Sequence, residues 1–453
     1  MNLSYMRKPL PSKAKLLFAL VLSSSFPTFS QSLTLSPYSR FALGDLQQPL
    51  FVRGSGMGQA VQAVRSRSNL NPANPASYSA LGLTTFEAGL HSSFTTLKTN
   101  ADIQTYRNSG FNYVALGFPI SEKKKIGGSV GLMPFSSVGY KITEERDYGF
   151  AKAFNVFEGG GGLSKLYLGF GKDFWKRLSI GVQGSYIFGN MTNVRNMTFS
   201  DPTLHNLKDD RSKQVSGFFG EAGFQFHFDI KDSSKVDILT GKRKLKHLYN
   251  MCIGGTSNMQ TNLNGTQQVE VFSYQFFGGT LITDTVLYQP AAKGNIVYPM
   301  GFSGGMVFQE FDQWSILADV GFRQWKNFTN FGNIENLANQ LRFSLGYSYI
   351  PDFSAEKKRH YMRTVEYRAG LRYDQGFLSL NSTRVGEKAI SIGLGLPFIL
   401  QKQLSDKEAA RIQLSLEFVN RGTTKQNLIS ENYFRFLFGI TFNDKWFQQR
   451  KIY

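Results

Sequence analysis

The sequence predicts an all-β protein, namely a transmembrane antiparallel β-barrel of about fourteen strands with an N-terminal hatch segment. Three observations lead to this prediction. The start of the chain has the composition of a signal peptide, and most of the remaining chain alternates between apolar and polar residues. No stretch after the signal contains the roughly 18 consecutive apolar residues that identify a membrane-spanning helix. Strands are therefore the elements expected to cross the membrane.

The N-terminus predicts export. Basic residues precede the short apolar stretch 16–22, and small residues occupy the positions just before a cut at Gln31; these residues are Arg7, Lys8, Lys13 and Lys15, then Thr28 and Ser30. This order of a basic, an apolar and a small-residue region is that of a secretory signal peptide. The alternative is an apolar N-terminal helix. We expect residues 1–30 to be removed and the mature protein to reside in the outer membrane of a Gram-negative bacterium.

Period-two alternation is the main evidence for strands. Between Arg411 and Phe418 every second residue is apolar, and the residues between are polar or charged. Successive side chains of a strand point to opposite faces, and about ten residues suffice for a tilted strand to cross the hydrocarbon. An even number of strands allows an antiparallel barrel to close. Fourteen segments have this pattern: 83–94, 110–120, 125–134, 163–172, 177–189, 216–229, 248–258, 298–308, 314–324, 340–350, 364–374, 388–398, 410–420 and 432–442.

The connections between these segments predict the orientation. Three of them are long, with roughly 28, 26 and 39 residues, and all three join an odd to an even segment, as external loops do when both termini are periplasmic. We expect external loops at 135–162, 190–215 and 259–297. The barrel is expected over 83–444, followed by a basic periplasmic tail at 445–453.

Residues 31–82 do not alternate and predict a compact irregular segment that plugs the lumen or lies beneath it. Asn-Pro pairs start turns and proline removes a hydrogen-bond donor, so we expect at most one short helix, near 59–65. The segment also contains arginines, Arg40, Arg53, Arg65 and Arg67, that we expect to face acidic residues of the inner wall. The residues expected to define this hatch are Gly54, Gly56, Met57, Gly58, Asn71, Pro72, Ala73, Asn74 and Pro75.

The chain resembles the family of outer-membrane long-chain fatty-acid and aromatic-hydrocarbon transporters. The resemblance rests on Gly56-Met57-Gly58 followed by Asn71-Pro72-Ala73, on the count of fourteen strands and on the aromatic last strand. It implies a fourteen-stranded barrel closed by a hatch that contains the Asn-Pro-Ala turn. The start at 36–45 and the end at 441–447 are similar to an uncharacterised subgroup. Unlike the well-studied members, this chain continues past its last strand.

The resemblance also implies a lateral exit where the third strand is interrupted. The corresponding residues here are Gly131, Pro134 and Phe135. A proline cannot donate to the strand ladder, so a local break is chemically reasonable. The alternative is that Pro134 simply ends the strand.

The polar faces supply charges of both signs, which we expect to pair into a network within the lumen; an alternative is that some arginines grip an anionic head group. The expected members are Glu221, Asp319, Arg342, Glu366, Arg368, Arg372, Arg411, Glu417 and Arg435. No Ser-His pair or metal-ligand spacing stands out, so the sequence predicts no enzyme, no metal site and no cofactor.

Two functions remain after these exclusions. One is a passive channel for hydrophobic small molecules such as fatty acids or aromatics, with lateral exit to the membrane. The other is a non-transporting accessory or structural subunit of an outer-membrane protein assembly or secretion complex. The net charge of +19 favours anionic partners, and for an exported protein these are outer-membrane lipids rather than nucleic acid. A hydrophobic ligand and other outer-membrane proteins are the further partners considered.

Overall fold

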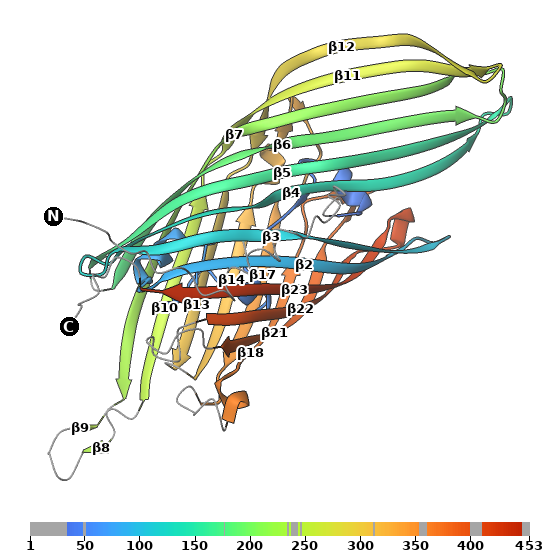
Figure 1. The fold of residues 1–453 in the computed structure, drawn as a ribbon. Helices are drawn as coiled ribbons and strands as arrows, with labels where there is room; N and C mark the ends of the chain where they lie inside the picture. The colour runs from blue at the N-terminus through green and yellow to red at the C-terminus, as the bar shows by residue number, and fades with distance from the viewer. Residues whose placement is uncertain are drawn as a thin grey trace, which may run out of the picture. The chain divides into compact units, whose positions relative to one another are not determined.

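Fourteen antiparallel strands close into one barrel (Figure 1). The computed structural model describes residues 34–48, 51–175, 177–232, 235–236, 243–244, 247–310, 313–352, 360–398 and 410–445, with backbone only between 231 and 248. The sheet closes because the last strand pairs with the first, from Thr84↔Asp444 to Lys98↔Ser430. The strands of the ring are β2 (Thr84–Lys98), β3 (Ile103–Ser121), β4 (Ile126–Asp147), β5 (Lys152–Trp175), β6 (Leu178–Phe199), β7 (Asn206–Asp232), β10 (His247–Asn258), β13 (Gly301–Glu310), β14 (Trp314–Arg323), β17 (Gln340–Tyr349), β18 (Glu366–Asp374), β21 (Glu387–Phe398), β22 (Ala410–Gly422) and β23 (Ser430–Asp444).

The remaining elements are short, apart from one long hairpin. The hairpin consists of β11 (Thr261–Phe277) and β12 (Thr280–Tyr298). The short strands are β1 (Asp45–Leu46), β8 (Lys235–Val236), β9 (Arg243–Lys244), β15 (Thr329–Asn330), β16 (Asn333–Ile334), β19 (Ser379–Leu380) and β20 (Thr383–Arg384). The helical turns are η1 (Pro37–Arg40), α2 (Val52–Ser55), η2 (Pro75–Ala80), η3 (Trp325–Asn327), η4 (Tyr361–Thr364) and η5 (Lys425–Asn427).

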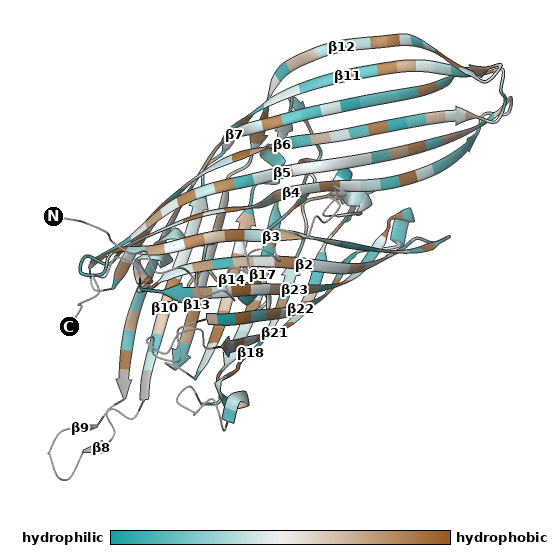
Figure 2. Ribbon diagram, in the orientation of Figure 1, coloured by the Kyte–Doolittle hydropathy of each residue, from teal (hydrophilic) through white to brown (hydrophobic). Residues whose placement is uncertain are grey.

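Each strand of the ring presents one apolar and one polar face, which Figure 2 shows as alternating colours along the ribbons. On β18, Leu371 and Tyr373 are exposed on the outer wall, whereas Glu366, Arg368 and Arg372 are buried inside. An outer wall of exposed apolar side chains is what hydrocarbon requires, while the lumen accepts charge. The predicted all-β barrel of about fourteen strands is confirmed. No helix among the described residues is both long and apolar enough to cross a membrane.

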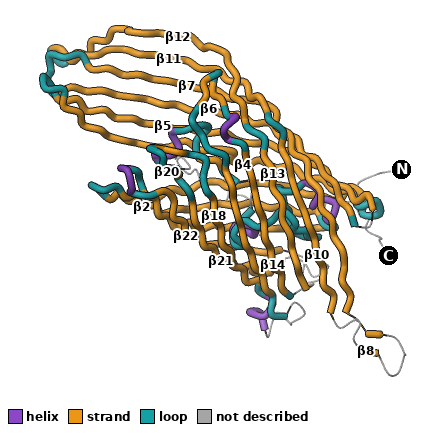
Figure 3. The backbone as a smooth tube through the Cα atoms, turned by 180° about the vertical axis from the view of Figure 1, so that it is seen from behind, coloured by secondary structure: helices purple, strands orange, loops and turns teal. Residues whose placement is uncertain are grey.

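Six strands extend far beyond the rest of the ring (Figure 3). β4, β5, β6 and β7 contain 22, 24, 22 and 27 residues, about twice what a tilted strand needs to cross the hydrocarbon. Where β10 ends, β11 takes its place against β7, starting at Asn264↔Ser216. We call the six-stranded part formed by 136–147, 152–162, 190–199, 206–215, β11 and β12 the external sheet.

The external sheet corrects the prediction of long external loops. Most of the segments 135–162, 190–215 and 259–297 are strands joined by tight turns. Polar stretches such as 207–214 do not favour strands by composition, but neighbours on both sides pair with them, since β7 is bonded there to β6 and to β11. Tertiary pairing therefore overrides local propensity.

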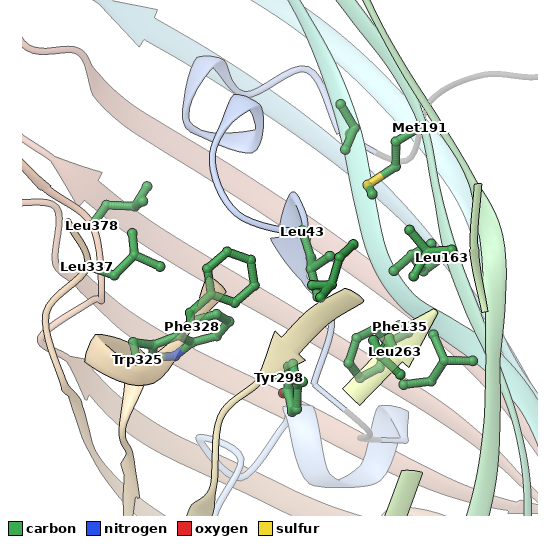
Figure 4. Packing of buried hydrophobic residues seen from close by; sticks show 14 of the residues in the cluster. Leu43, Phe135, Leu163, Met191, Leu263, Tyr298, Trp325, Phe328, Leu337 and Leu378 are labelled. Carbon is green, nitrogen blue, oxygen red and sulfur yellow. The ribbon is translucent and has the colours of Figure 1, made fainter. Parts of the chain in front are cut away.

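Two connections on the same end of the barrel fold back into the lumen. The 324–339 and 375–386 connections place Trp325, Phe328 and Leu378 in an apolar cluster with Leu43 of the N-terminal segment and Phe135 of β4 (Figure 4). Trp325 stacks on Phe377 with ring centroids 4.2 Å apart. The lumen is therefore filled on this side by packed side chains.

Candidate functional site

A row of inward-facing glycines positions the N-terminal segment inside the barrel. A Cβ at any of these glycines would overlap or press on backbone or side chains of residues 52–78. The wall and the segment therefore approach each other at backbone distance, which only glycine permits. We call residues 51–82 the hatch. The glycines are Gly117, Gly127, Gly171, Gly181, Gly223, Gly254, Gly346, Gly370, Gly393 and Gly439.

Gly58 illustrates why the glycines of the hatch itself are needed. Its φ of +62° lies in the left-handed region, which favours glycine. Its amide donates to the Ser391 hydroxyl of β21 at 2.9 Å, and Gly370 of β18 leaves room for it. The single α-helical turn of the hatch is α2 at Val52–Ser55, not the predicted helix near 59–65. Residues 59–65 form hydrogen-bonded turns instead.

Two asparagines hold the second half of the hatch together. The Asn71 amide donates to the carbonyl oxygens of Val61 and Val64 at 2.7 and 3.1 Å. Asn74 is fully buried; its amide donates to Phe224 of β7, and its side-chain oxygen caps η2 by accepting from the Ala76 amide. Pro75 follows as the first residue of η2, a position that suits proline. Of the nine expected hatch residues, all are buried except the half-buried Ala73.

Charged groups tie the hatch to the wall. Arg53 donates to Glu366 at 2.8 Å, and Arg411 of β22 contacts the same carboxylate at 3.2 Å. Arg65 contacts Asp173 at 3.2 Å. Arg53 therefore meets an acid that the sequence analysis named, whereas Arg65 meets one that it did not.

Two further wall carboxylates accept backbone amides rather than arginines. Asp319 accepts from Val61 at 2.6 Å and from Gln62 at 2.9 Å. Glu87 accepts from Leu70 at 2.8 Å. These carboxyl oxygens satisfy donors that the irregular hatch backbone would otherwise leave unpaired in the barrel interior.

A chain of ion pairs runs along the inner wall beside the hatch, over the neighbouring strands β18, β21, β22 and β23. Arg372 pairs with Glu387 and lies 3.7 Å from Glu417, which in turn lies 3.5 Å from Arg435. A separate pair joins Arg342 to Asp374 at 2.9 Å.

The other expected members of the network lie apart from this chain. Glu221 contacts Lys165 at 3.3 Å, and Asp319 binds the hatch amides described above. Arg368 is buried beside Gly393, and its three nitrogens have no hydrogen-bond partner among the described residues. The predicted set is thus divided into several local groups.

Some lumen charges were missed because the predicted strands were slightly short. Glu387, Arg421 and Glu431 lie one residue outside the predicted segments 388–398, 410–420 and 432–442, yet all three face inward. Arg421 contacts Asp45 at 2.7 Å and Glu431 at 3.7 Å. Continuing the period-two pattern by one residue at each end identifies them.

The charged groups surround a small polar cavity of about 140 Å³. Its lining includes both signs of charge, from Arg342, Arg372, Asp374, Glu387 and Arg421. A hydrophobic ligand requires a mostly apolar pocket, so this cavity suits water or a polar group. A larger apolar hollow of about 830 Å³ lies on the outer wall, between Phe94 of β2 and Phe343 of β17, where membrane lipid has direct access to it.

The residues of the expected strand break, Gly131, Pro134 and Phe135, lie where the pairing between β3 and β4 ends. Pairing of β3 with β4 ends at Val114↔Leu132, but β4 itself continues to Asp147. Pro134 therefore neither ends nor interrupts the strand, which bulges at Phe135 against β5, as an extra residue in one strand does. Gly131 packs against Tyr167.

The edge that β4 exposes there is covered by the N-terminal segment. β1 pairs with it through Asp45↔Ser137 and Leu46↔Ser136, and the Gln47 amide donates to the Phe135 carbonyl at 2.9 Å. Phe135 points inward, 5.4 Å from the Tyr298 ring. The separation of β3 and β4 is thus occupied by the chain's own backbone.

No group of acidic, histidine and cysteine side chains within the described part of the chain is arranged to hold a metal ion. Cys252 of β10 is buried beside the hatch, as a small packed residue. The signal residues and most of the tail at 445–453 lie outside the described residues, so both remain predictions.

Comparison with known proteins identifies both a family and a fold. The family model described as BamG matches residues 13–453. No curated protein matches this chain.

Solved structures of outer-membrane barrels match at low identity. The Pseudomonas putida toluene transporter TodX is 14% identical, with 89% of this chain and 99% of that chain covered at a TM-score of 0.54. A Pseudomonas aeruginosa FadL homologue is 11% identical, covers 88% and 99%, and has a TM-score of 0.55. The Ralstonia pickettii toluene transporter TbuX is 14% identical, covers 86% and 97%, and has a TM-score of 0.51. The fold of this chain is that of these outer-membrane transporters, as the resemblance predicted.

Proposed function

The chain belongs to the BamG family, and we propose that it is a closed barrel acting as a non-transporting subunit of an outer-membrane protein assembly or secretion complex. The main support is the covered gap between β3 and β4, where β1 occupies the edge of β4 at Ser136 and Ser137. The hatch fills the lumen below this point and the apolar cluster fills it above. Within the described residues, these contacts occupy the lumen and the edge of β4, which supports a barrel that is closed to ligands.

A gentle extraction from native membranes tests this proposal. The tagged full-length protein is purified in mild detergent, and the bound proteins and lipids are identified by mass spectrometry. We expect stoichiometric recovery of at least one other outer-membrane protein and no conductance of the purified barrel in planar bilayers. Recovery of the barrel alone, with measurable uptake of aromatics or fatty acids by cells that express it, would contradict the proposal.

The second candidate is a passive channel for hydrophobic small molecules with lateral exit near Gly131, Pro134 and Phe135. The observation that favours it is the end of β3–β4 pairing at Leu132, next to these residues. In this case β1 acts as a gate that must leave β4. Lateral release suits a greasy molecule because its burial is worth about 25 cal/mol per Å², which release into water would forfeit.

A reversible crosslink separates the two candidates. Leu46→Cys with Ser136→Cys places cysteines at paired positions, where the Cα separation of about 4.5–5.5 Å in antiparallel strands suits a disulfide. The native Cys252 is buried and does not compete. A channel gated by β1 loses uptake on oxidation and regains it on reduction, so the same protein is its own control. The subunit function predicts no uptake in either state and unchanged recovery of the partner.

A further inference from the structure

The external sheet has two free edges of opposite character. On one side, β4 beyond Tyr140 pairs with β5 only, and no strand of the described chain lies along its other edge; its segment Lys141–Asp147 contains five charged residues among seven. On the other side, β12 pairs with β11, and its second edge is unpaired in the described chain from Thr280 until Ile296 meets Asn330 of β15. Its segment 280–288 contains one charge, Asp284.

An unpaired edge is a template for another strand, and natural proteins protect such edges with charges, proline or bulges. The β4 edge has the charges. The part of β12 nearer the barrel, from Pro290 to Lys293, begins with a proline and lies next to an irregularity in the β11–β12 pairing at 289–292. The segment 280–288 lacks both a proline and clustered charge and contains one irregularity, where Val286 is the extra residue opposite Val271 and Phe272. At nine residues it offers about 30 Å of strand.

Five of the nine side chains of this edge are apolar and exposed. Leu281, Ile282, Val286, Leu287 and Tyr288 are 43% to 59% exposed. They lie on both faces of the strand, because Leu281 and Ile282 are adjacent. The adjoining tip residues Phe276 and Phe277 are exposed as well. Large apolar side chains exposed together on a protein surface mark a candidate interaction site.

The location of the patch excludes membrane lipid as its occupant. Next to the apolar wall residues Tyr186 and Phe188 of β6, the outward positions become polar, with Asn190 and Thr192. β11 begins to pair with β7 at this level and leads away from the barrel. Lipid also cannot satisfy a row of backbone donors and acceptors, whereas a strand does.

We infer that the 280–288 edge of β12 binds, by strand addition, an extended segment of another outer-membrane protein at the cell surface. Strand addition supplies affinity through main-chain hydrogen bonds and specificity through alternate side chains. The exposed residues on both faces call for a partner strand that is itself largely apolar. This inference rests on the proposed subunit function and names the surface through which it operates.

Matched lysine substitutions on the two edges test the inference. Thr283→Lys places a charge at the centre of the apolar edge, and Thr143→Lys makes the same exchange on the charged edge; both threonines are exposed. We expect recovery of the partner protein from native membranes to fall by about tenfold or more with Thr283→Lys, as for a central interface contact. Recovery with Thr143→Lys should match the wild type. Both variants should keep a heat-modifiable band on gels, which shows that the barrel is folded.

Hydrogen exchange distinguishes strand pairing from side-chain contact. In the purified complex, amides of 280–288 should be protected relative to the isolated barrel, and those of 141–147 should not. A partner that is retained by Thr283→Lys, with 280–288 unprotected, would show that the edge is not the site while leaving the subunit function intact. If the amides of 280–288 are protected in the purified protein without a partner, and that protein has twice the mass of one chain, the edge binds a second copy of this chain and the inference is overturned. If the wild type recovers no outer-membrane protein, the proposed function and the inference both fail.

Discussion

Replacing Gly370 by alanine tests whether the hatch rests directly on the barrel wall. Gly370 faces the lumen from β18, and a Cβ there would overlap the backbone of Met57 and Gly58. Its neighbour in the register is Ser391, whose hydroxyl accepts the Gly58 amide. A methyl group at position 370 therefore pushes Gly58 away from the wall and weakens the hydrogen bond from its amide to the Ser391 hydroxyl.

The expected loss follows from two terms. Overpacking of a well-filled interior costs about 1–3 kcal/mol, and loss of the Gly58–Ser391 hydrogen bond costs about 1 kcal/mol. Gly370→Ala should therefore lower the free energy of unfolding by about 2–4 kcal/mol. The control is Gly184→Ala on β6, because that position faces outward with nothing near the added methyl group. Surface changes of this kind fall within about 0.5 kcal/mol.

Urea unfolding in lipid vesicles measures both variants. Both substitutions add one methyl group to a glycine of the barrel. A difference between their free energies of unfolding is therefore due to the hatch that lies against Gly370. The anchors at Arg53 and Arg65 remain, and we expect Gly370→Ala to stay non-conducting in planar bilayers. Equal stability of Gly370→Ala and Gly184→Ala would refute the close contact between hatch and wall.

Four further outcomes are expected. Leu414→Arg, on the lipid face, should cost about 2–4 kcal/mol near the bilayer midplane. The sequence alone predicts that Ser415→Arg is tolerated far better, but Ser415 donates to the Val52 carbonyl at 2.7 Å, so vesicle unfolding should show a loss for it as well. Glu366→Gln removes the carboxylate shared by Arg53 and Arg411 and should destabilise by about 3–5 kcal/mol in the same assay. Deleting residues 34–82 should raise single-channel conductance in planar bilayers, and an unchanged conductance would show that these residues are not a plug.

The sequence was sufficient to predict the barrel but not its full height. All fourteen predicted segments coincide with ring strands, because alternation is strict where one face meets lipid and the other the lumen. Beyond the apolar wall, 207–214 of β7 is polar on both faces, so it has no apolar face to reveal it as a strand. The ten-residue length expected of a membrane-crossing strand also led to strands that were too short.

The hatch was predicted as an irregular segment, but its contacts were not. Which wall residue lies opposite Gly58 or Asn74 depends on the stagger of the strands around the barrel, and this is a property of the closed sheet. The inward glycines were visible as part of the polar faces. Their common purpose appears only when the structure places the hatch against each of them.

The number of anchors bears on which function the barrel can perform. At least six contacts to ion pairs or carboxyl groups hold the N-terminal segment to the wall; these include Arg53–Glu366, Arg65–Asp173, Asp45–Arg421, the Val61 and Gln62 amides on Asp319, and the Leu70 amide on Glu87. At about 1–3 kcal/mol each, they are together comparable with or larger than the roughly 8 kcal/mol that a ligand of micromolar affinity supplies.

A small hydrophobic ligand forms no polar contacts that could replace these. A ligand shifts the equilibrium between a bound and a released hatch only to the extent that it binds one of these states more tightly. Release of the hatch therefore requires either partial movement, in which β1 leaves β4 while the other anchors hold, or a macromolecule with a large interface. The disulfide between Leu46→Cys and Ser136→Cys prevents β1 from leaving β4. It does not prevent a macromolecule from displacing the hatch. Uptake that survives this crosslink, in a barrel purified free of other proteins, would show that the anchors are weaker than their geometry implies.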